Sequence, residues 1–77
     1  MIKVPVNFRQ TDEVLEFVKI VNEYPFHMDL VSGSRAVDAK SLMGTLAISE
    51  ATPLSLMIHS APSQTTERLL SQMHSFS

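Results

Sequence analysis

The sequence predicts an α+β fold, a two-layer open-faced sandwich in which helices cover one face of a four-stranded antiparallel sheet. Four short segments alternate apolar and polar residues, which is the period of a half-buried strand. Three other segments carry apolar residues at helical spacing. Along the chain these segments follow the order βαββαβα. The polar residues between the apolar ones in the strands predict that one face of the sheet is open to water.

The spacing of the apolar residues changes from the alternation of a strand to helical spacing between the first two elements. Pro5 has no N–H to donate, so the first strand is expected at a sheet edge or at a bulge. Residues 11–23 have helical spacing, with Thr11 as the expected N-cap and two carboxylates in the first turn, where the helix dipole stabilises them. Pro25 ends this helix. The apolar residues of the first strand are Ile2, Val4, Val6 and Phe8.

A hairpin and a short helix are expected in the middle of the chain. Residues 26–38 contain two alternating segments on either side of the turn signal Ser32-Gly33-Ser34. Ser41 is placed to cap a short helix through residues 42–46. Gly44 weakens that helix, because glycine is a poor helix former.

The last strand and the last helix follow a break at Thr52-Pro53. Residues 54–59 show the clearest alternation in the chain, which predicts the fourth strand. Ser63 or Thr65 is expected to cap the final helix, because a hydroxyl accepts hydrogen bonds from the free N–H groups at a helix start. The apolar residues of that helix are Leu69, Leu70, Met73 and Phe76.

Length, charge and cysteine content exclude several classes of protein. A chain of 77 residues forms one domain, residues 1–77. A net charge of −2 does not favour nucleic-acid binding, and no run approaches the ~20 apolar residues of a membrane span. The absence of cysteine excludes disulfides and thiolate metal sites and favours a cytoplasmic location. An acyl carrier protein is disfavoured, because that class is helical, strongly acidic and has Asp before its serine, whereas Lys40 precedes Ser41.

Three histidines, His27, His59 and His74, are scattered along the chain. None of them has the His-x-x-x-His or carboxylate spacing of a metal site, so we expect surface histidines, no bound metal and no cofactor. His59 is expected on the exposed face of the sheet beside Met57, where an imidazole can respond to pH.

The segment from Ser32 to Gly44 resembles the HPr family, the phosphocarrier proteins of the bacterial sugar phosphotransferase system. Within it, Lys40-Ser41-Leu42-Met43-Gly44 is similar to the residues around the regulatory serine of the family. The resemblance extends forward to residues 54–58, which are like its fourth strand, and back to residues 17–19 in its first helix. It implies a domain that is not an enzyme and has the element order predicted above.

The chain departs from the family at the phosphorylation site. HPr proteins have a histidine at the start of the first helix, followed by Ala-Arg-Pro or Thr-Arg-Pro. Here Gln10 stands at the histidine position, Asp12 at the arginine position and Glu13 at the proline position. Phosphotransfer needs an imidazole nucleophile and a cation near the phosphoryl oxygens, so we expect neither phosphohistidine nor a catalytic residue. Catabolite-repression HPr-like proteins also have glutamine there, but they keep the Arg-Pro that this chain lacks.

Ser41 has two interpretations. The resemblance implies that it is the serine that an HPr kinase phosphorylates, with the helix N-terminus and Lys40 stabilising the phosphate. As a helix N-cap alone, Ser41 would contribute about 1 kcal/mol to stability, which also explains its presence.

A set of residues on the first helix and the short helix matches the partner-docking surface of the family. An exposed apolar cluster usually marks a docking surface, although the same residues could instead close the core. The resemblance implies protein partners, namely an HPr kinase or a transcriptional regulator. The competing hypothesis is a structural or interaction module without phosphorylation. The set consists of Leu15, Lys19, Leu42, Met43 and Leu46.

Overall fold

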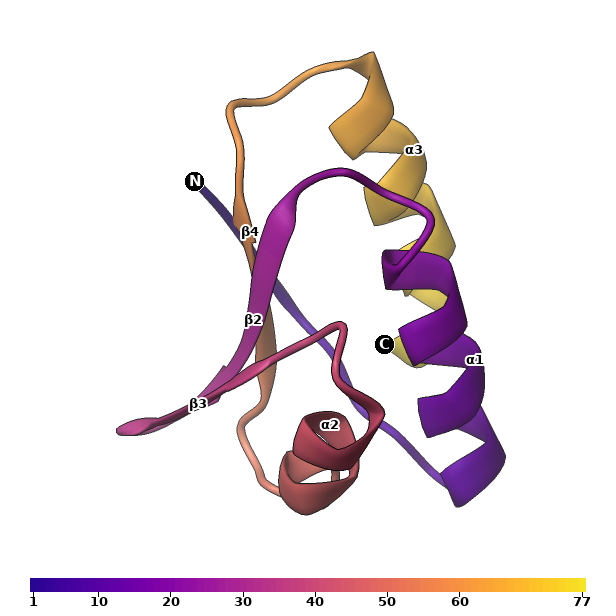
Figure 1. The fold of residues 1–77 in the computed structure, drawn as a ribbon, viewed down its shortest axis with the longest axis vertical. Helices are drawn as coiled ribbons and strands as arrows, with labels where there is room; N and C mark the ends of the chain where they lie inside the picture. Colours follow the sequence, from indigo (N-terminus) through magenta and orange to yellow (C-terminus); the bar gives the residue numbers. More distant parts are fainter.

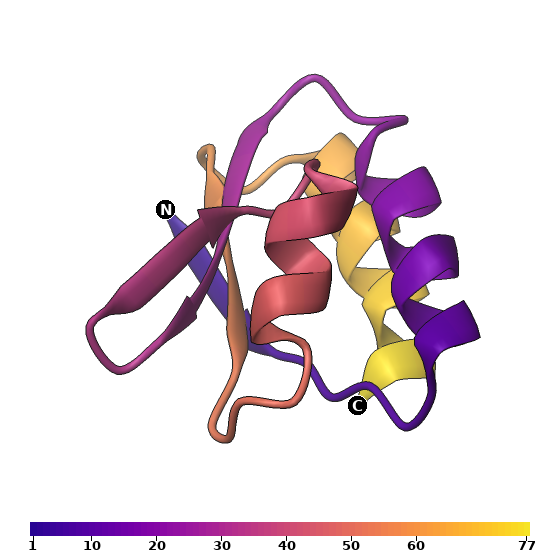
Figure 2. The same ribbon diagram turned by 60° about the horizontal axis from the view of Figure 1, so that its bottom comes forward.

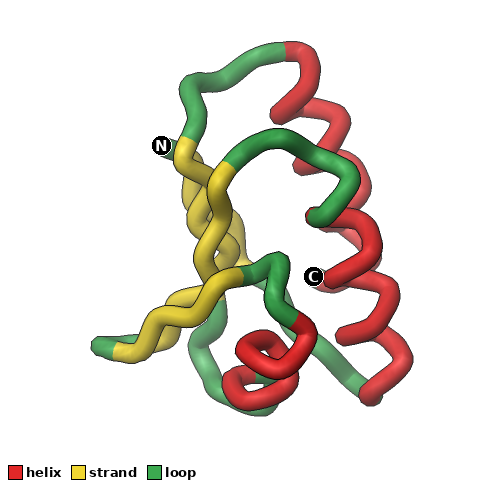
Figure 3. Tube along the Cα trace, in the orientation of Figure 1, coloured by secondary structure: helices red, strands yellow, loops and turns green.

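The computed structural model describes residues 1–77 and confirms the α+β open-faced sandwich (Figure 1). A four-stranded sheet forms one layer, and the helices all lie on one side of it, as Figure 3 shows. None of these helices combines the length and the apolar character needed to cross a membrane. The elements are β1 (Ile2–Pro5), α1 (Thr11–Val21), β2 (His27–Ser32), β3 (Arg35–Asp38), α2 (Leu42–Ile48), β4 (Ser55–His59), α3 (Gln64–Met73) and a 3₁₀ turn (His74–Phe76).

The sheet is antiparallel throughout, with the strand order β1-β4-β2-β3. β2 and β4 form the central pair, in which Leu30 lies opposite Leu56. β1 and β3 are the edges, so Pro5 lies at the end of an edge strand, where its missing N–H is tolerated. The β2–β3 hairpin extends away from the helices in Figure 2. Gly33 in its turn has a φ of 60°, a conformation that glycine adopts without steric cost.

Alternation along β2 and β4 separates the core from the open face of the sheet. Met28, Leu30, Leu56 and Ile58 are completely buried, whereas the residues between them are half-buried or exposed. Side chains from α1 and α3 complete this core, and Phe17 is also completely buried. The helices therefore pack on the face that the apolar residues of the strands define, as the sequence predicts.

Three phenylalanines hold the two ends of the chain against α1. The ring centroids are 5.1 Å apart for Phe8 and Phe17, 5.5 Å for Phe17 and Phe76, and 5.8 Å for Phe8 and Phe76, all with edge-on geometry. Such contacts add about 0.5–1.5 kcal/mol to the burial of the rings. The Asn7 N–H also donates a hydrogen bond to the Phe76 carbonyl. The segment before α1 and the segment after α3 are thus fixed to each other.

The start of α1 differs from the sequence prediction. The N-cap is Gln10 rather than Thr11, because the extended backbone ends at Gln10, where φ is −154° and ψ is 164°. The Gln10 side chain makes no capping hydrogen bond. Instead, Glu13 reaches back, and its Oε1 accepts a hydrogen bond from the Arg9 N–H at 2.9 Å. This contact fixes the segment before the helix to its first turn, but it leaves the free N–H groups of the helix start without a side-chain cap.

The end of α1 and the start of α3 can also be compared with the sequence prediction. α1 ends at Val21, short of Glu23, the last residue of the predicted helix. α3 begins with a capping box, in which the Thr66 N–H donates to Ser63 Oγ at 3.2 Å and the Ser63 N–H donates to Thr66 Oγ1 at 2.7 Å. Of the two expected caps, Ser63 is therefore the cap and Thr65 lies inside the helix.

Candidate functional site

The N-terminus of α1, where the resemblance places the phosphorylation site, is open to solvent. Gln10 is exposed and borders an open hollow of about 390 Å³ between the start of α1 and the end of α2. No histidine lines this hollow, and an amide side chain is not a nucleophile for phosphoryl transfer. The polar lining comprises Arg9, Gln10 and Thr11 at the start of α1, and Ser49 and Glu50 directly after α2.

The charges around Gln10 do not favour a phosphoryl group. The Arg9 guanidinium lies 3.7 Å from Glu13 Oε2 and donates to the main-chain carbonyl of Ser77 at 2.9 Å. Arg9 therefore offsets Glu13, while Asp12 forms no ion pair. An unpaired carboxylate at the arginine position has the wrong sign of charge for holding phosphoryl oxygens.

Ser41 is the N-cap of α2, as predicted. Its half-exposed side chain accepts a hydrogen bond from the Gly44 N–H at 3.1 Å. Lys40, which was expected to stabilise a phosphate on Ser41, donates its ammonium group to the Tyr24 carbonyl at 2.6 Å. An ammonium has three N–H donors, so two of them stay available for another acceptor.

The predicted docking residues lie on α1 and α2, two helices that contact each other. Met43 is 83% exposed, Leu15 51%, Leu46 41% and Leu42 40%. α2 buries only two of its seven residues, which confirms that so short a helix leaves apolar residues uncovered. Lys19 is exposed in the last turn of α1. We call these five residues the α1–α2 patch.

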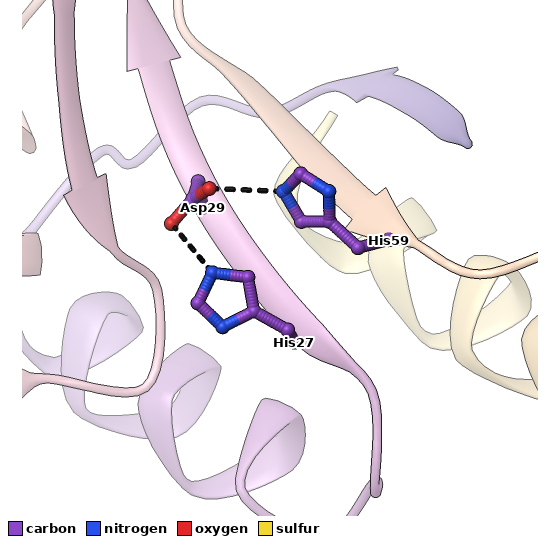
Figure 4. Close-up of side chains that lie close together, drawn as sticks. All are labelled: His27, Asp29 and His59. Carbon is purple, nitrogen blue, oxygen red and sulfur yellow. Dashed lines mark hydrogen bonds and ion pairs between the residues drawn. The ribbon is translucent and has the colours of Figure 1, made fainter.

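Strand pairing also brings together a group of side chains that the sequence analysis missed. His27 and His59 are direct partners across β2 and β4, and Asp29 follows His27 on the same face of β2. His59 Nε2 lies 2.9 Å from Asp29 Oδ2, and His27 Nε2 lies 3.4 Å from Asp29 Oδ1 (Figure 4). This group is on the open face of the sheet, whereas His74 is the C-cap of α3. None of the histidines is at the start of α1.

The sequence indicates only part of this group of side chains. Alternation alone places His27 and Asp29 on one face of a strand. Nothing local places His59 opposite His27, because β3 and α2 separate β2 from β4 in the chain. The pairing register, and not any spacing along the sequence, decides which residues meet.

A four-stranded antiparallel sheet covered on one face by three helices, in the order βαββαβα, defines a class of open-faced α+β domains. Solved structures that resemble this chain include two HPr proteins. HPr-C-His from Thermoanaerobacter tengcongensis has a TM-score of 0.71 and 14% identity, covering 96% of this chain and 90% of its own. The phosphocarrier protein HPr from Bacillus anthracis str. Ames has a TM-score of 0.70 and 22% identity, and the match covers 99% of this chain and 94% of that protein. No family model and no curated protein matches the sequence. The chain therefore has the HPr fold.

Proposed function

We propose that this chain is an HPr-like protein, related to the phosphocarriers of the sugar phosphotransferase system, that carries no phosphohistidine. In this proposal it binds protein partners through the α1–α2 patch, and phosphorylation of Ser41 controls that binding. The observation that carries the proposal is the exposure of four large apolar side chains on α1 and α2, two of which directly follow a helix-capping serine. The partners would be an HPr kinase, which installs the phosphate, and a transcriptional regulator, which responds to it.

The loss of histidine chemistry is supported by the start of α1. The hollow beside Gln10 contains no imidazole, and the Arg9 guanidinium is already bound to Glu13 and to a main-chain carbonyl. The carboxylate of Asp12 is unpaired in the first turn. A phosphoryl group at this position would meet repulsion and no nucleophile.

A phosphate on Ser41 would act on the patch through charge. It adds a charge of about −1.5 to −2 to the residue directly before Leu42. Its oxygens can accept the Gly44 N–H that the hydroxyl now binds, so the helix start need not unfold. The apolar surface would then have a strongly anionic border, which changes the partners that it binds.

The alternative is an interaction module in which Ser41 is never phosphorylated. The geometry of the cap favours it, because the Gly44 hydrogen bond accounts for Ser41 without any regulatory role. The Lys40 ammonium also donates to the Tyr24 carbonyl and makes no hydrogen bond to Ser41.

The experiment is incubation with an HPr kinase from a related bacterium and ATP, followed by intact-mass spectrometry. We expect one phosphate on the wild-type chain and none on Ser41→Ala. Met43→Ser should slow the labelling, because Met43 is the most exposed apolar side chain of the patch. Ala61→Ser, in the exposed loop after β4, is the matched control and should label at the wild-type rate.

Stability measurements on the same variants separate capping from regulation. Ser41→Ala should lower the free energy of unfolding by about 1 kcal/mol, and Ser41→Asp should leave it nearly unchanged, because aspartate caps equally well. Urea denaturation measures both values. If no kinase labels Ser41, and Ser41→Asp leaves the binding of patch partners unchanged, then Ser41 is only a cap and the interaction module is the correct function.

A further inference from the structure

We propose that His27, Asp29 and His59 form a binding site for a divalent transition-metal ion, with Zn²⁺ as its representative, on the open face of the sheet. One ligand atom from each residue is available, and these atoms all lie within 4.8 Å of one another. The site is independent of the function proposed above, because the α1–α2 patch is on the helices that cover the opposite face of the sheet.

The fold sets the positions of the three ligands. Directly opposed residues in an antiparallel pair have Cβ atoms about 4.5–5.5 Å apart, so the pairing of His27 with His59 brings the imidazoles together. Their ring centroids are 5.0 Å apart. Asp29 is the next residue of β2 on that face, and Figure 4 shows both rings turned toward its carboxylate. Each histidine presents its Nε2 to a different oxygen of Asp29.

The distances are close to those of a tetrahedral metal site. Zinc binds imidazole nitrogen at about 2.0–2.1 Å and carboxylate oxygen at about 2.0–2.2 Å, so neighbouring ligand atoms lie about 3.4 Å apart. His59 Nε2 lies 2.9 Å from one oxygen of Asp29, and His27 Nε2 lies 3.4 Å from the other oxygen, so the carboxylate is near both imidazoles. The candidate ligand atoms, one from each residue, all lie within 4.8 Å of one another, so no pair has to approach by more than about 1.4 Å, and rotation of the side chains provides this movement.

The donor set and its exposure determine which ion fits. Two imidazoles and one carboxylate suit Zn²⁺, Cu²⁺ or Ni²⁺, whereas Mg²⁺ and Ca²⁺ prefer oxygen ligands alone. The side chain of His27 is 65% exposed, that of His59 32% and that of Asp29 27%, so an ion can enter from solvent. Three protein ligands leave a coordination position for water.

A second carboxylate adds to the negative charge near the site. Asp38 of β3 lies directly opposite Asp29 in the sheet. Like charges in opposed positions destabilise a strand pair, and a bound cation would relieve their repulsion. Asp38 Oδ1 accepts the Lys40 N–H at 2.9 Å, so this carboxylate is held in place outside the ligand set.

The test is calorimetric titration of the full chain, without a histidine tag, with zinc chloride. We expect saturable binding of one equivalent. His27→Gln, Asp29→Asn and His59→Gln should each weaken the affinity by at least about tenfold, since even the loss of a group that only supports a ligand costs that much. His74→Gln removes a histidine outside the site and should leave the affinity unchanged. Magnesium chloride should give no binding at the same concentrations.

NMR of the wild-type chain covers the case in which a variant fails to fold. Added Zn²⁺ should shift the imidazole signals of His27 and His59 before that of His74. The thermal midpoint should rise, because the ion binds only the folded state. The proposal is overturned if no saturable zinc binding occurs, if His74→Gln abolishes it, if Asp29→Asn leaves it intact, or if Mg²⁺ binds as tightly. An intact zinc site with no kinase labelling, or the reverse, would separate the two proposals.

Discussion

Asp12 stands in the first turn of α1, where the helix dipole stabilises its negative charge and no basic side chain pairs with it. A phosphoryl group bound at the same helix start would need the same positive end of the dipole. The Asp12 carboxylate would therefore repel the phosphoryl group. For this reason, restoring a nucleophile at Gln10 without changing Asp12 leaves the obstacle in place.

This argument predicts the outcome of phosphorylation with phosphoenolpyruvate and enzyme I. The wild-type chain and Gln10→His should both acquire no acid-labile phosphate, whereas Gln10→His combined with Asp12→Arg should show slow transfer. Intact-mass spectrometry before and after acid treatment measures the label, with an authentic HPr as the positive control. Stoichiometric phosphohistidine on His27, His59 or His74 of the wild-type chain would contradict the prediction.

At the residue scale, the interactions that could be predicted from the sequence are the local ones. The Ser41 cap spans three residues, so a serine before an apolar run was sufficient to place it. The bond from Lys40 to the Tyr24 carbonyl spans 16 residues, and that from His59 to Asp29 spans 30. Such partners depend on how distant elements pack, and no spacing rule contains that information.

At the scale of elements, α2 depends on its surroundings. Helices of seven residues are not stable alone in water, because nucleation is costly and few hydrogen bonds follow it. Thr45 of α2 is completely buried and donates its hydroxyl to the Ala39 carbonyl at 3.2 Å, which fixes the helix to the preceding loop. Packing on α1 and this anchor allow α2 to present apolar side chains to solvent.

Adjacent residues of β4 lie on opposite faces of the sheet, so we expect their truncation to lower the stability by different amounts. Leu56 is completely buried in the central strand pair, so Leu56→Ala should lower the free energy of unfolding by about 2–5 kcal/mol. Met57 points to the open face, and Met57→Ala should cost less than about 1 kcal/mol. Chemical denaturation followed by circular dichroism gives both values. Equal losses at the two positions would mean that the open face is covered.

At the scale of the whole molecule, the core is small. Seventeen of the 77 residues are buried, and a chain of this length typically has a free energy of unfolding of about 4–12 kcal/mol. Phe76→Ala removes a ring that contacts both Phe8 and Phe17, and the loss should be about 3–5 kcal/mol. Thermal unfolding should therefore show a much lower midpoint for this variant. Ser75→Ala, at the exposed neighbouring residue, should leave the midpoint within a few degrees of the wild-type value.

The sequence was sufficient for the element order and for the face that each element buries, because periods of 2 and 3.6 residues are local properties. It was not sufficient for the strand order β1-β4-β2-β3, which places the first and last strands side by side. Periodicity contains no information on which strands are neighbours, so the order of the strands in the sheet came from the structure. The candidate metal site depends on that same topology.

The edges of the sheet have a consequence for how molecules of this protein meet one another. β1 carries Lys3 and ends at Pro5, and β3 is four residues long, with Arg35 and Asp38 at its ends. A strand from another molecule would find no N–H at Pro5 and would have to strip water from the charged side chains. The edge strands therefore disfavour pairing with a strand of another molecule, which opposes the formation of fibrils at high protein concentration.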